Sequence, residues 1–252
     1  MMKILLSGCN GKMGQVITRI CANHPAMKIV AGCDLYDKQL SDYPVYAKFE
    51  LVQEQADVVI DFSNPNALEG LLNFCTDKKI PVVVATTGLN EKQKDMLKNA
   101  SDIIAVFYSA NMSLGVNLLI ELVKKAAVIL EDQFDIEIIE KHHNQKIDAP
   151  SGTALAIADA INEAVNIPKN YMYDRHAVRK KREKTEIGIH AVRGGTIVGE
   201  HSVIFAGLDE VIEFKHQANS KEIFVTGALK ASQFLLDKPA GLYSMKDIFN
   251  HE

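Results

Sequence analysis

Residues 140–154, EKHHNQKIDAPSGTA, hold the densest group of chemically capable side chains in the chain. His142 and His143 can exchange protons near neutral pH, and Lys146 follows them as a cation. A cation beside a bound substrate stabilises developing negative charge and can donate a proton. The run therefore predicts proton transfer to a substrate, with a solvated loop or a zinc site as the alternatives. Zinc is disfavoured because adjacent loop histidines point apart and neither an HExxH motif nor a cysteine lies nearby.

The same run ends in hydroxyl groups at the expected start of a helix. Ser151 and Thr153 flank Gly152 and lead into an alanine-rich segment, 153–164, with helical spacing. The first amides of a helix have no partner within the helix, and hydroxyls placed there add further hydrogen-bond donors. Such donors cradle carboxylates, so the expected ligand is a small acid, such as a dicarboxylate. A helix cap without a ligand is the alternative.

A second motif follows the first expected strand, residues 3–7. Residues 8–14, GCNGKMG, form a GxxGxxG version of the dinucleotide-binding fingerprint and open a segment of helical spacing. Glycines let the backbone approach a pyrophosphate, which the N-terminus of the helix attracts. Asp34 follows the second expected strand, where an acidic side chain binds the adenosine ribose. A tight glycine turn without a ligand is the alternative. The cofactor-binding residues expected here are Gly8, Asn10, Gly11, Lys12, Met13, Gly14 and Asp34.

Two later strand ends are expected at the same edge of the sheet. One ends in Asp61, Phe62 and Ser63, and the next is followed by Thr86, Thr87 and Gly88. Ligands of open α/β sheets bind at the carboxyl ends of the strands, so these residues are candidates to line the ribose and nicotinamide. Taken singly, each is an ordinary loop segment.

The elements that must position these residues alternate between short apolar runs and helical spacing over the first hundred residues. This pattern is typical of βαβ units around a parallel sheet, so we expect a Rossmann-like, doubly wound α/β domain. The expected strands are residues 3–7, 29–33, 56–62, 81–85 and 103–107, and the expected helices are residues 13–23, 66–76 and 91–99.

The pattern changes near Asn111, which indicates a second α+β domain built on a mixed or antiparallel sheet. A long helix over 116–130 and a strand over 135–140 come first, followed by three alternating segments that we interpret as antiparallel strands. A helix over 222–236 is expected to return to the first domain. We therefore expect a dinucleotide-binding domain of residues 1–111 plus 222–252, and a substrate-binding and oligomerisation domain of residues 112–221. The alternating segments are residues 186–192, 197–205 and 210–216, and their polar face, with Glu186, His190, Glu200 and Lys215, is either solvated or an oligomer contact.

Composition excludes several classes of protein. The 252 residues are 47% hydrophobic and 24% charged with a net charge of −4, so the chain has the profile of a globular protein without a global field for nucleic acid. No apolar stretch approaches ~20 residues, and no secretory leader is recognisable, so we expect no membrane contact and a cytoplasmic location. Four cysteines without a CxxC pair suit a reducing compartment. A basic cluster lacks interleaved aromatic residues and is expected to be a solvated strand or a subunit contact: Arg175, Arg179, Lys180, Lys181, Arg182 and Lys184.

The run EKHHNQKIDAPSGTA resembles the signature of the 4-hydroxy-tetrahydrodipicolinate reductase family, also called dihydrodipicolinate reductase. Six further segments resemble the family in the same order, and together they span nearly the whole chain. These segments are GCNGKMG (8–14), DFSNP (61–65), ATTG (85–88), SANMSLGVN (109–117), VRGGTIVGEH (192–201) and the closing GLYSMKDIF.

The resemblance implies NAD(P)H-dependent reduction of a small cyclic imine dicarboxylate to tetrahydrodipicolinate, in lysine and diaminopimelate biosynthesis, by a homotetramer assembled through the second domain's sheet. Position by position, it implies that His142 is the active-site histidine and Lys146 the proton donor. It also implies substrate binding by His143, Ser151, Gly152 and Thr153. To the cofactor residues it adds Ala85 and the segment Ser109, Ala110, Asn111 and Met112.

Two other classes remain open at this point. One is an amino-acid dehydrogenase of the aspartate type with the same two-domain plan, and the other is a non-catalytic dinucleotide-sensing regulator. The combination of His142, His143 and Lys146 argues against both. A regulator has no use for a proton donor, and a dehydrogenase of this type is expected to oxidise an amino acid with NAD.

The residues after the second strand bear on the choice of cofactor. A 2′-phosphate about 4 Å from the Asp34 carboxylate would be repelled by about 4 kcal/mol at an effective dielectric constant of about 20. Lys12 and Lys38 offset this repulsion in part, so we expect use of NADH and NADPH with NADH favoured.

Overall fold

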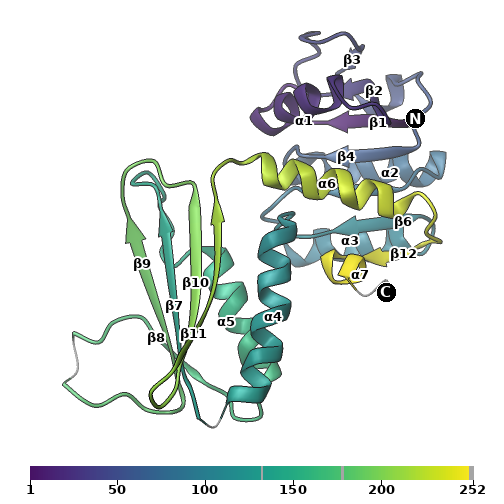
Figure 1. Ribbon diagram of the computed structural model, residues 1–252. Helices are drawn as coiled ribbons and strands as arrows, with labels where there is room; N and C mark the ends of the chain where they lie inside the picture. Colours follow the sequence, from purple (N-terminus) through teal and green to yellow (C-terminus); the bar gives the residue numbers. More distant parts are fainter. Residues whose placement is uncertain (132, 177–178, 250–252) are drawn as a thin grey trace. The chain divides into compact units, whose positions relative to one another are not determined.

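The computed structural model describes residues 1–131, 133–176 and 179–249 (Figure 1). The chain divides into two compact units: Met1–Ser113 together with the segment that begins at Glu222, and Leu114–Lys221. The boundary expected after residue 111 lies two residues before this division. None of the described helices is long and apolar enough to cross a membrane.

The first unit is built on a parallel sheet of seven strands in the order β12-β6-β5-β4-β1-β2-β3. The expected Rossmann-like fold is therefore confirmed. All carboxyl ends of the strands lie along one edge, and this edge carries the glycine turn and the later strand-end motifs. The strands are β1 (Met2–Ser7), β2 (Met27–Cys33), β3 (Val45–Tyr46), β4 (Val58–Asp61), β5 (Val82–Val84), β6 (Ala105–Tyr108) and β12 (Gly241–Tyr243).

Helices cover both faces of this sheet (Figure 1). On one face, α2 and α3 pack against each other and bury Leu71 and Leu97 against the sheet residues Val59 and Val106. On the other face, α6 contacts α1 and strands β4, β5 and β6. The helices are α1 (Lys12–Ala22), α2 (Leu68–Lys78), α3 (Glu91–Ser101), α6 (Glu222–Leu235) and α7 (Met245–Phe249), with short 3-10 turns at Phe49–Leu51 and Pro65–Ala67.

The second unit is a mixed sheet of five strands in the order β11-β10-β7-β9-β8, with α4 and α5 packed on one face. Helix α4 buries Val116, Leu119, Val123 and Ala127, which recur every three or four residues and so form one stripe. The elements are α4 (Leu114–Leu130), β7 (Asp135–His142), α5 (Gly152–Ala164), β8 (Asn170–Met172), β9 (Glu186–Arg193), β10 (Gly199–Ala206) and β11 (Val211–Ala218).

The prediction of three consecutive antiparallel strands is wrong for the first of them. Strand β10 pairs antiparallel with β11, but β9 pairs parallel with β7 and β8 instead of with β10. Strand β7 lies between β9 and β10, so their connection crosses the end of β7. There the Gly194 amide donates to the His142 carbonyl (2.9 Å), and the Asn144 amide donates to the Gly195 carbonyl (3.2 Å). Strand β7 is also longer than expected, and Lys141 and His142 belong to the strand instead of the loop.

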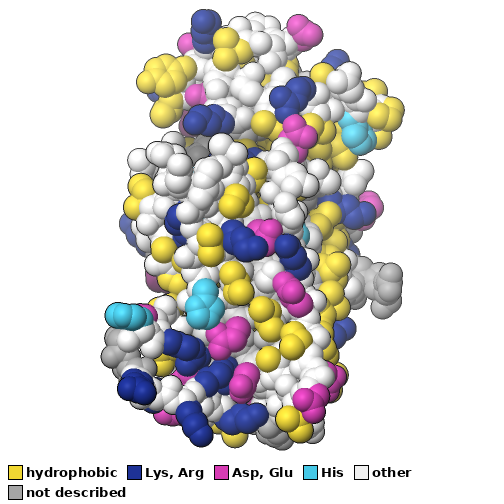
Figure 2. All heavy atoms as spheres, turned by 60° about the vertical axis from the view of Figure 1, so that its left-hand side comes forward, with side chains coloured by type: hydrophobic (Ala, Val, Ile, Leu, Met, Phe, Trp, Pro, Cys, Tyr) yellow, Lys and Arg dark blue, Asp and Glu magenta, His cyan; other side chains and the backbone are white. Residues whose placement is uncertain are grey.

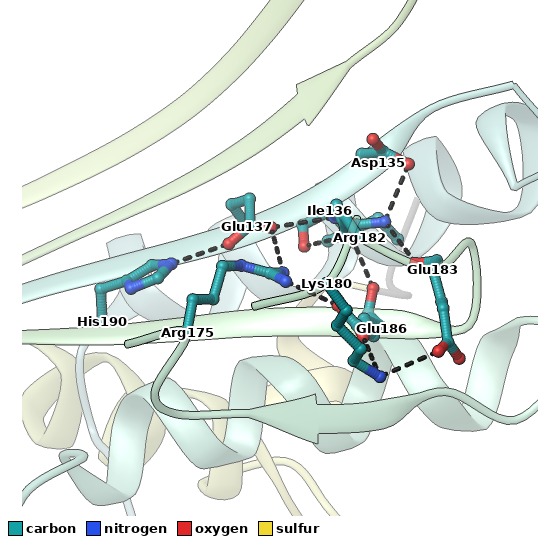
Figure 3. A network of polar contacts seen from close by, with 9 residues as sticks. All are labelled: Asp135, Ile136, Glu137, Arg175, Lys180, Arg182, Glu183, Glu186 and His190. Carbon is teal, nitrogen blue, oxygen red and sulfur yellow. Dashed lines mark hydrogen bonds and ion pairs between the residues drawn. The ribbon is translucent and has the colours of Figure 1, made fainter. Parts of the chain in front are cut away.

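The outward face of this sheet carries an ion-pair network (Figure 3). The Glu137 carboxylate accepts hydrogen bonds from Arg175 (3.1 Å), Arg182 (3.0 Å) and His190 (2.7 Å). Arg175 also donates to Glu186 (2.7 Å). The basic cluster is thus not a solvated strand: its described residues lie outside any strand, and Arg175, Lys180 and Arg182 pair with acids of the sheet and its flanking turn. Figure 2 shows such side chains of both signs interleaved on one face.

Candidate active site

The glycine turn of the first unit depends on close backbone approaches. Gly8 has a φ of +75°, and a Cβ there would lie 2.7 Å from the Phe62 carbonyl oxygen. A Cβ on Gly14 would lie 2.2 Å from the Gly8 carbonyl oxygen. Helix α1 starts at Lys12 without a side-chain cap on its first amides. The turn therefore presents backbone donors that an anion can approach.

Asp34 is tied to this turn through Asn10. The Asn10 amide donates to Asp34 Oδ2 (3.0 Å), and its side-chain Nδ2 donates to the carbonyls of Tyr36 (2.7 Å) and Lys38 (2.9 Å). The loop after β2 is therefore held against the glycine turn. This contact fixes the position of the carboxylate expected to meet the ribose.

A pocket of about 490 Å³ opens at this edge of the sheet. Five residues of the expected cofactor set line it: Gly8, Gly11, Asp34, Phe62 and Ser63. Sequence reasoning missed Lys48 and Phe49, which also line the pocket. Strand β3, which precedes them, brings them there by pairing with the end of β2. Next to this pairing, the Asp34 amide donates to the Tyr46 carbonyl (3.0 Å). Two residues are too few to show a strand periodicity, so the sequence carried no signal for β3.

The Asp61 side chain links the ends of strands β1, β4 and β5 at this edge. Its buried carboxylate accepts hydrogen bonds from Ser63 Oγ (2.5 Å) and Thr86 Oγ1 (2.6 Å), and it also interacts with the Ser7 hydroxyl. Burial raises the pKa of Asp61, against the effect of these donors. Asp61 thus positions the strand ends that carry the expected cofactor residues Phe62, Ser63 and Thr86. The sequence made Asp61 a candidate to line the ribose and nicotinamide, but it did not reveal these bonds between strand ends.

The remaining expected cofactor residues follow β5 and β6 at the same edge. Ala85 and Thr86 are buried, whereas Thr87 and Gly88 are exposed, and these four do not line the pocket. After β6, Ser109 Oγ donates to the Asn111 carbonyl (2.8 Å), and the Ser113 amide donates to Asn111 Oδ1 (2.9 Å). These bonds fold residues 109–113, including Ala110 and Met112, into a compact turn.

In the second unit, Glu140 organises the end of β7 and the start of α5. Its fully buried carboxylate accepts two hydrogen bonds from the Arg193 guanidinium (both 2.7 Å), and others from His142 Nδ1 (2.6 Å) and the Ser151 amide (3.0 Å). Burial alone would raise the pKa of Glu140, but Arg193 and His142 hold it below its usual value. Arg193 also donates to the Asp148 carbonyl (2.7 Å).

The contact with Glu140 sets the chemistry available to His142. Since the Glu140 carboxylate accepts a hydrogen bond from Nδ1, the Nδ1 atom carries a proton. Nε2 is then the ring nitrogen that can contact a substrate. Gly199 gives this ring room, because a Cβ there would lie 3.1 Å from His142 Nε2.

Ser151 is the N-cap of α5, and its Oγ accepts from the Ala154 amide (3.1 Å). Ser151 Oγ also lies 3.0 Å from Nε2 of the buried His201. Gly152 is exposed and Thr153 half-buried on the first turn of the helix. Sequence reasoning placed the cap correctly, but it missed Glu140, Arg193 and His201 because these partners are 11 to 53 residues distant along the chain.

Lys146 lies on the loop between β7 and α5. Its Nζ is 2.8 Å from Asp148 Oδ1, and this ammonium lowers the pKa of Asp148. The Lys146 amide also donates to the carbonyl of the half-buried His143 (3.1 Å), which closes a turn. The structure thus brings His142 and Ser151 together on Glu140, and it places His143 and Lys146 on the adjoining loop.

Family models match the chain almost from end to end. The dihydrodipicolinate reductase N-terminus model covers residues 2–112, and the C-terminus model covers residues 115–249. The chain belongs to the dihydrodipicolinate reductase family. As a member of this family it is an oxidoreductase, which decides against the non-catalytic regulator.

Several relatives of the family are similar over their full length. A protein of Caldanaerobacter subterraneus subsp. tengcongensis named 4-hydroxy-tetrahydrodipicolinate reductase is 54% identical over 98% of both chains. A protein of the same name from Clostridium novyi is 48% identical, again over 98% of both. A dipicolinate-bound dihydrodipicolinate reductase from Paenisporosarcina sp. TG-14 has a TM-score of 0.82 at 25% identity, over 98% of this chain and 99% of that one.

Proposed function

We propose that this protein reduces 4-hydroxy-tetrahydrodipicolinate to tetrahydrodipicolinate with NADH or NADPH, in lysine and diaminopimelate biosynthesis. The observation that carries the proposal is the set formed by His142, Glu140 and Ser151. It combines an oriented histidine with the start of helix α5, in a chain whose other unit carries a dinucleotide turn. The names of the full-length relatives support the same reaction.

The first unit fits a nicotinamide dinucleotide. The tight turn requires glycine at positions 8 and 14, because a Cβ at either would meet backbone atoms, and the first amides of α1 face no side-chain cap. We place the pyrophosphate at these amides and the adenosine ribose at Asp34, with Lys12 and Met13 at the helix start. When bound, the dinucleotide supplies a hydride to the substrate.

The second unit binds the substrate and handles the proton. Ser151, Gly152 and Thr153 hold one carboxylate at the start of α5, and His143 contributes to binding. Hydride addition leaves negative charge on the substrate ring, which a nearby cation stabilises. Lys146 donates the proton that completes the reduction, and His142, fixed through Nδ1 by Glu140, provides the second polar contact to the ring.

NADH is the favoured cofactor in this proposal. The charged residues that line the pocket are Asp34, Glu50 and Lys48, two acids and one base. This balance disfavours the added charge of a 2′-phosphate, and Lys48 moderates the effect without reversing it.

We also propose a cytoplasmic homotetramer assembled through the outward face of the second sheet. Val192 and Val211 lie on that face and are 44% and 65% exposed. Apolar side chains exposed on one face of a sheet support a subunit contact there. Sedimentation of the purified protein tests the assembly, and a monomer at micromolar concentration would contradict it.

The decisive experiment couples the purified protein to dihydrodipicolinate synthase and follows the nicotinamide absorbance. We expect oxidation of NADH and, less efficiently, of NADPH only when the synthase product is present. Oxidation of an amino acid with NAD instead would indicate the aspartate-type dehydrogenase. Pyridine-2,6-dicarboxylate should inhibit competitively, and Thr153→Val should weaken that inhibition. An unchanged inhibition constant would place the carboxylate elsewhere.

A further inference from the structure

A buried histidine with no assigned role lies behind the proposed carboxylate site. His201, on β10, is 4% exposed, and its Nε2 is 3.0 Å from Ser151 Oγ. Its ring packs edge-on against His142, with centroids 5.2 Å apart. His201 therefore contacts two residues of the proposed site, His142 through its ring and Ser151 through Nε2.

Two proton arrangements are compatible with the contact between His201 and Ser151. In the first, the serine hydroxyl donates to Nε2, and the histidine proton is on Nδ1. In the second, Nε2–H donates to Ser151 Oγ. The second arrangement leaves the serine hydrogen unused, because Oγ accepts from both His201 and the Ala154 amide (3.1 Å).

The surroundings of the other ring nitrogen decide between them. Nδ1 of His201 is buried and has no hydrogen-bond partner among the residues that the structure describes. Burial, together with the nearby His142, lowers the pKa of His201 to about 4, so its ring carries a single proton at neutral pH. A buried N–H without an acceptor is rarer in proteins than a buried acceptor without a donor. The proton is therefore on Nε2, which is the second arrangement.

We infer that His201 is a positioning residue that donates to Ser151 and thereby turns the serine hydroxyl toward the substrate as a hydrogen-bond donor. Two donors occupy the lone pairs of Oγ, which leaves its hydrogen for an anionic oxygen beyond the helix start. The donated bonds also polarise the hydroxyl and strengthen its own bond. This inference rests on the proposed function, which places a substrate carboxylate at Ser151.

The test is a double-mutant cycle with the full-length protein and saturating NADH, read as the dissociation constant of pyridine-2,6-dicarboxylate by calorimetry. His201→Phe keeps an aromatic ring and removes the donor, and we expect roughly five- to tenfold weaker binding, since a hydrogen bond contributes about 1 kcal/mol. In a Ser151→Ala background the same substitution should change the constant less than about twofold. His201→Gln, whose amide can donate near the position of Nε2, should restore most of the affinity.

His216→Phe is the matched control. His216 lies directly opposite His201 on the paired strand β11, and its Nδ1 is also without a partner among the described residues. We expect no change in dicarboxylate binding for this variant, and no change in NADH binding for any of them. If His201→Phe does not fold, His201→Asn takes its place in the cycle, because its amide lies near the position of Nδ1 instead of Nε2.

The outcomes separate the inference from the proposed function. Equal weakening by His201→Phe with and without the Ser151 hydroxyl would show an effect of packing, and would overturn the inference alone. Unchanged dicarboxylate binding in Ser151→Ala would show that the carboxylate lies elsewhere, and would overturn the substrate placement on which the inference rests.

Discussion

Lys146 is the side chain whose proposed role is most easily separated from the rest of the site. It lies in the second unit, next to Asp148, and takes no part in the glycine turn. We expect Lys146→Ala to lower kcat by about 10²- to 10⁴-fold, the usual contribution of a general acid, and to leave the NADH dissociation constant within about twofold. Steady-state rates and calorimetric titration measure the two effects.

A second lysine of the same sequence run provides the control. On strand β7, Lys141 lies on the face opposite to that of His142, and it pairs with Glu200 (2.5 Å). Lys141→Ala should therefore leave kcat nearly unchanged. A near-normal kcat in Lys146→Ala would remove Lys146 from the mechanism.

Leu35 offers a test of cofactor choice. It lines the pocket beside Asp34 and is 78% exposed, so a longer side chain fits there without repacking. Leu35→Arg supplies a guanidinium fork suited to a phosphate, and should raise kcat/KM for NADPH by roughly tenfold with little change for NADH. Comparison of both cofactors in the wild type and the variant checks this. A wild-type preference for NADPH would show that the nearby lysines outweigh the carboxylates.

Residue types and local spacing were sufficient to predict the site residues that act through their immediate neighbours. Ser151 as a helix cap and Gly8 in a tight turn are examples, because their roles follow from the backbone next to them. The roles of Glu140 and His201 depend on partners from other parts of the chain, such as Ser151 at the start of α5. Their residue types alone would suit an exposed strand face equally well, so only the fold reveals them.

At the scale of elements, the close contact between Gly14 of α1 and the backbone of the preceding turn can be tested by substitution. Gly14→Ala places a Cβ against backbone oxygen, which cannot move without shifting the helix. We expect it to destabilise the protein by about 1–3 kcal/mol and to weaken NADH binding at least tenfold. Urea denaturation and fluorescence titration measure both quantities.

Gly70 in α2 is the matched helix glycine. A Cβ there would meet only Phe49 Cδ2, at 3.9 Å, which is an ordinary contact. Gly70→Ala should therefore stabilise the fold by about 0.5–1 kcal/mol, as alanine does within a helix. Equal effects of the two substitutions would show that the close approach at Gly14 does not determine the turn.

Helices and strands with a buried face were predictable from the sequence, but the order of the strands in the sheet was not. Periodicity located β9 and β10 within two residues, yet it could not show that β7 lies between them. Alternation reports which residues of a strand face the core, and says nothing about the adjacent strand. Strands β3, β8 and β12 escaped prediction because each has only two or three residues and none is a run of β-branched residues like the equally short β5.

At the scale of the whole molecule, buried and half-buried carboxylates set how stability responds to acid. Burial favours the protonated form of Glu137, but hydrogen bonds from His190 and Arg182 hold its pKa below the usual value. A lowered pKa in the folded state gives stability that is present above the unfolded pKa, near 4.5, and is lost as pH falls through the folded value. The free energy of unfolding should therefore fall below about pH 4.5, and Glu137→Gln should make this fall shallower.

The pKa of Asp61 is shifted in the opposite direction, so its effect on stability has the opposite sign. Burial raises its pKa, so the folded state binds its proton more tightly than the unfolded state, and its contribution to stability is largest in acid and lost as pH rises. Asp61→Asn should make the fall below pH 4.5 steeper. Urea denaturation of both variants across pH 3 to 7 checks the pair, and changes of the same sign in the two would contradict this assignment.

The route of the chain through the first unit has a consequence for how the protein is made. Strand β12 completes the edge of the sheet beside β6, and α6 covers strands β4, β5 and β6, yet both come after all of Leu114–Lys221 in the sequence. A nascent chain leaving the ribosome therefore exposes the open edge of β6 and an uncovered apolar sheet face while more than a hundred further residues are translated. The second unit is continuous and can close as soon as it emerges. The first unit therefore begins to form before the second and is completed after it, and during that interval its unpaired strand edge is open to pairing with other chains.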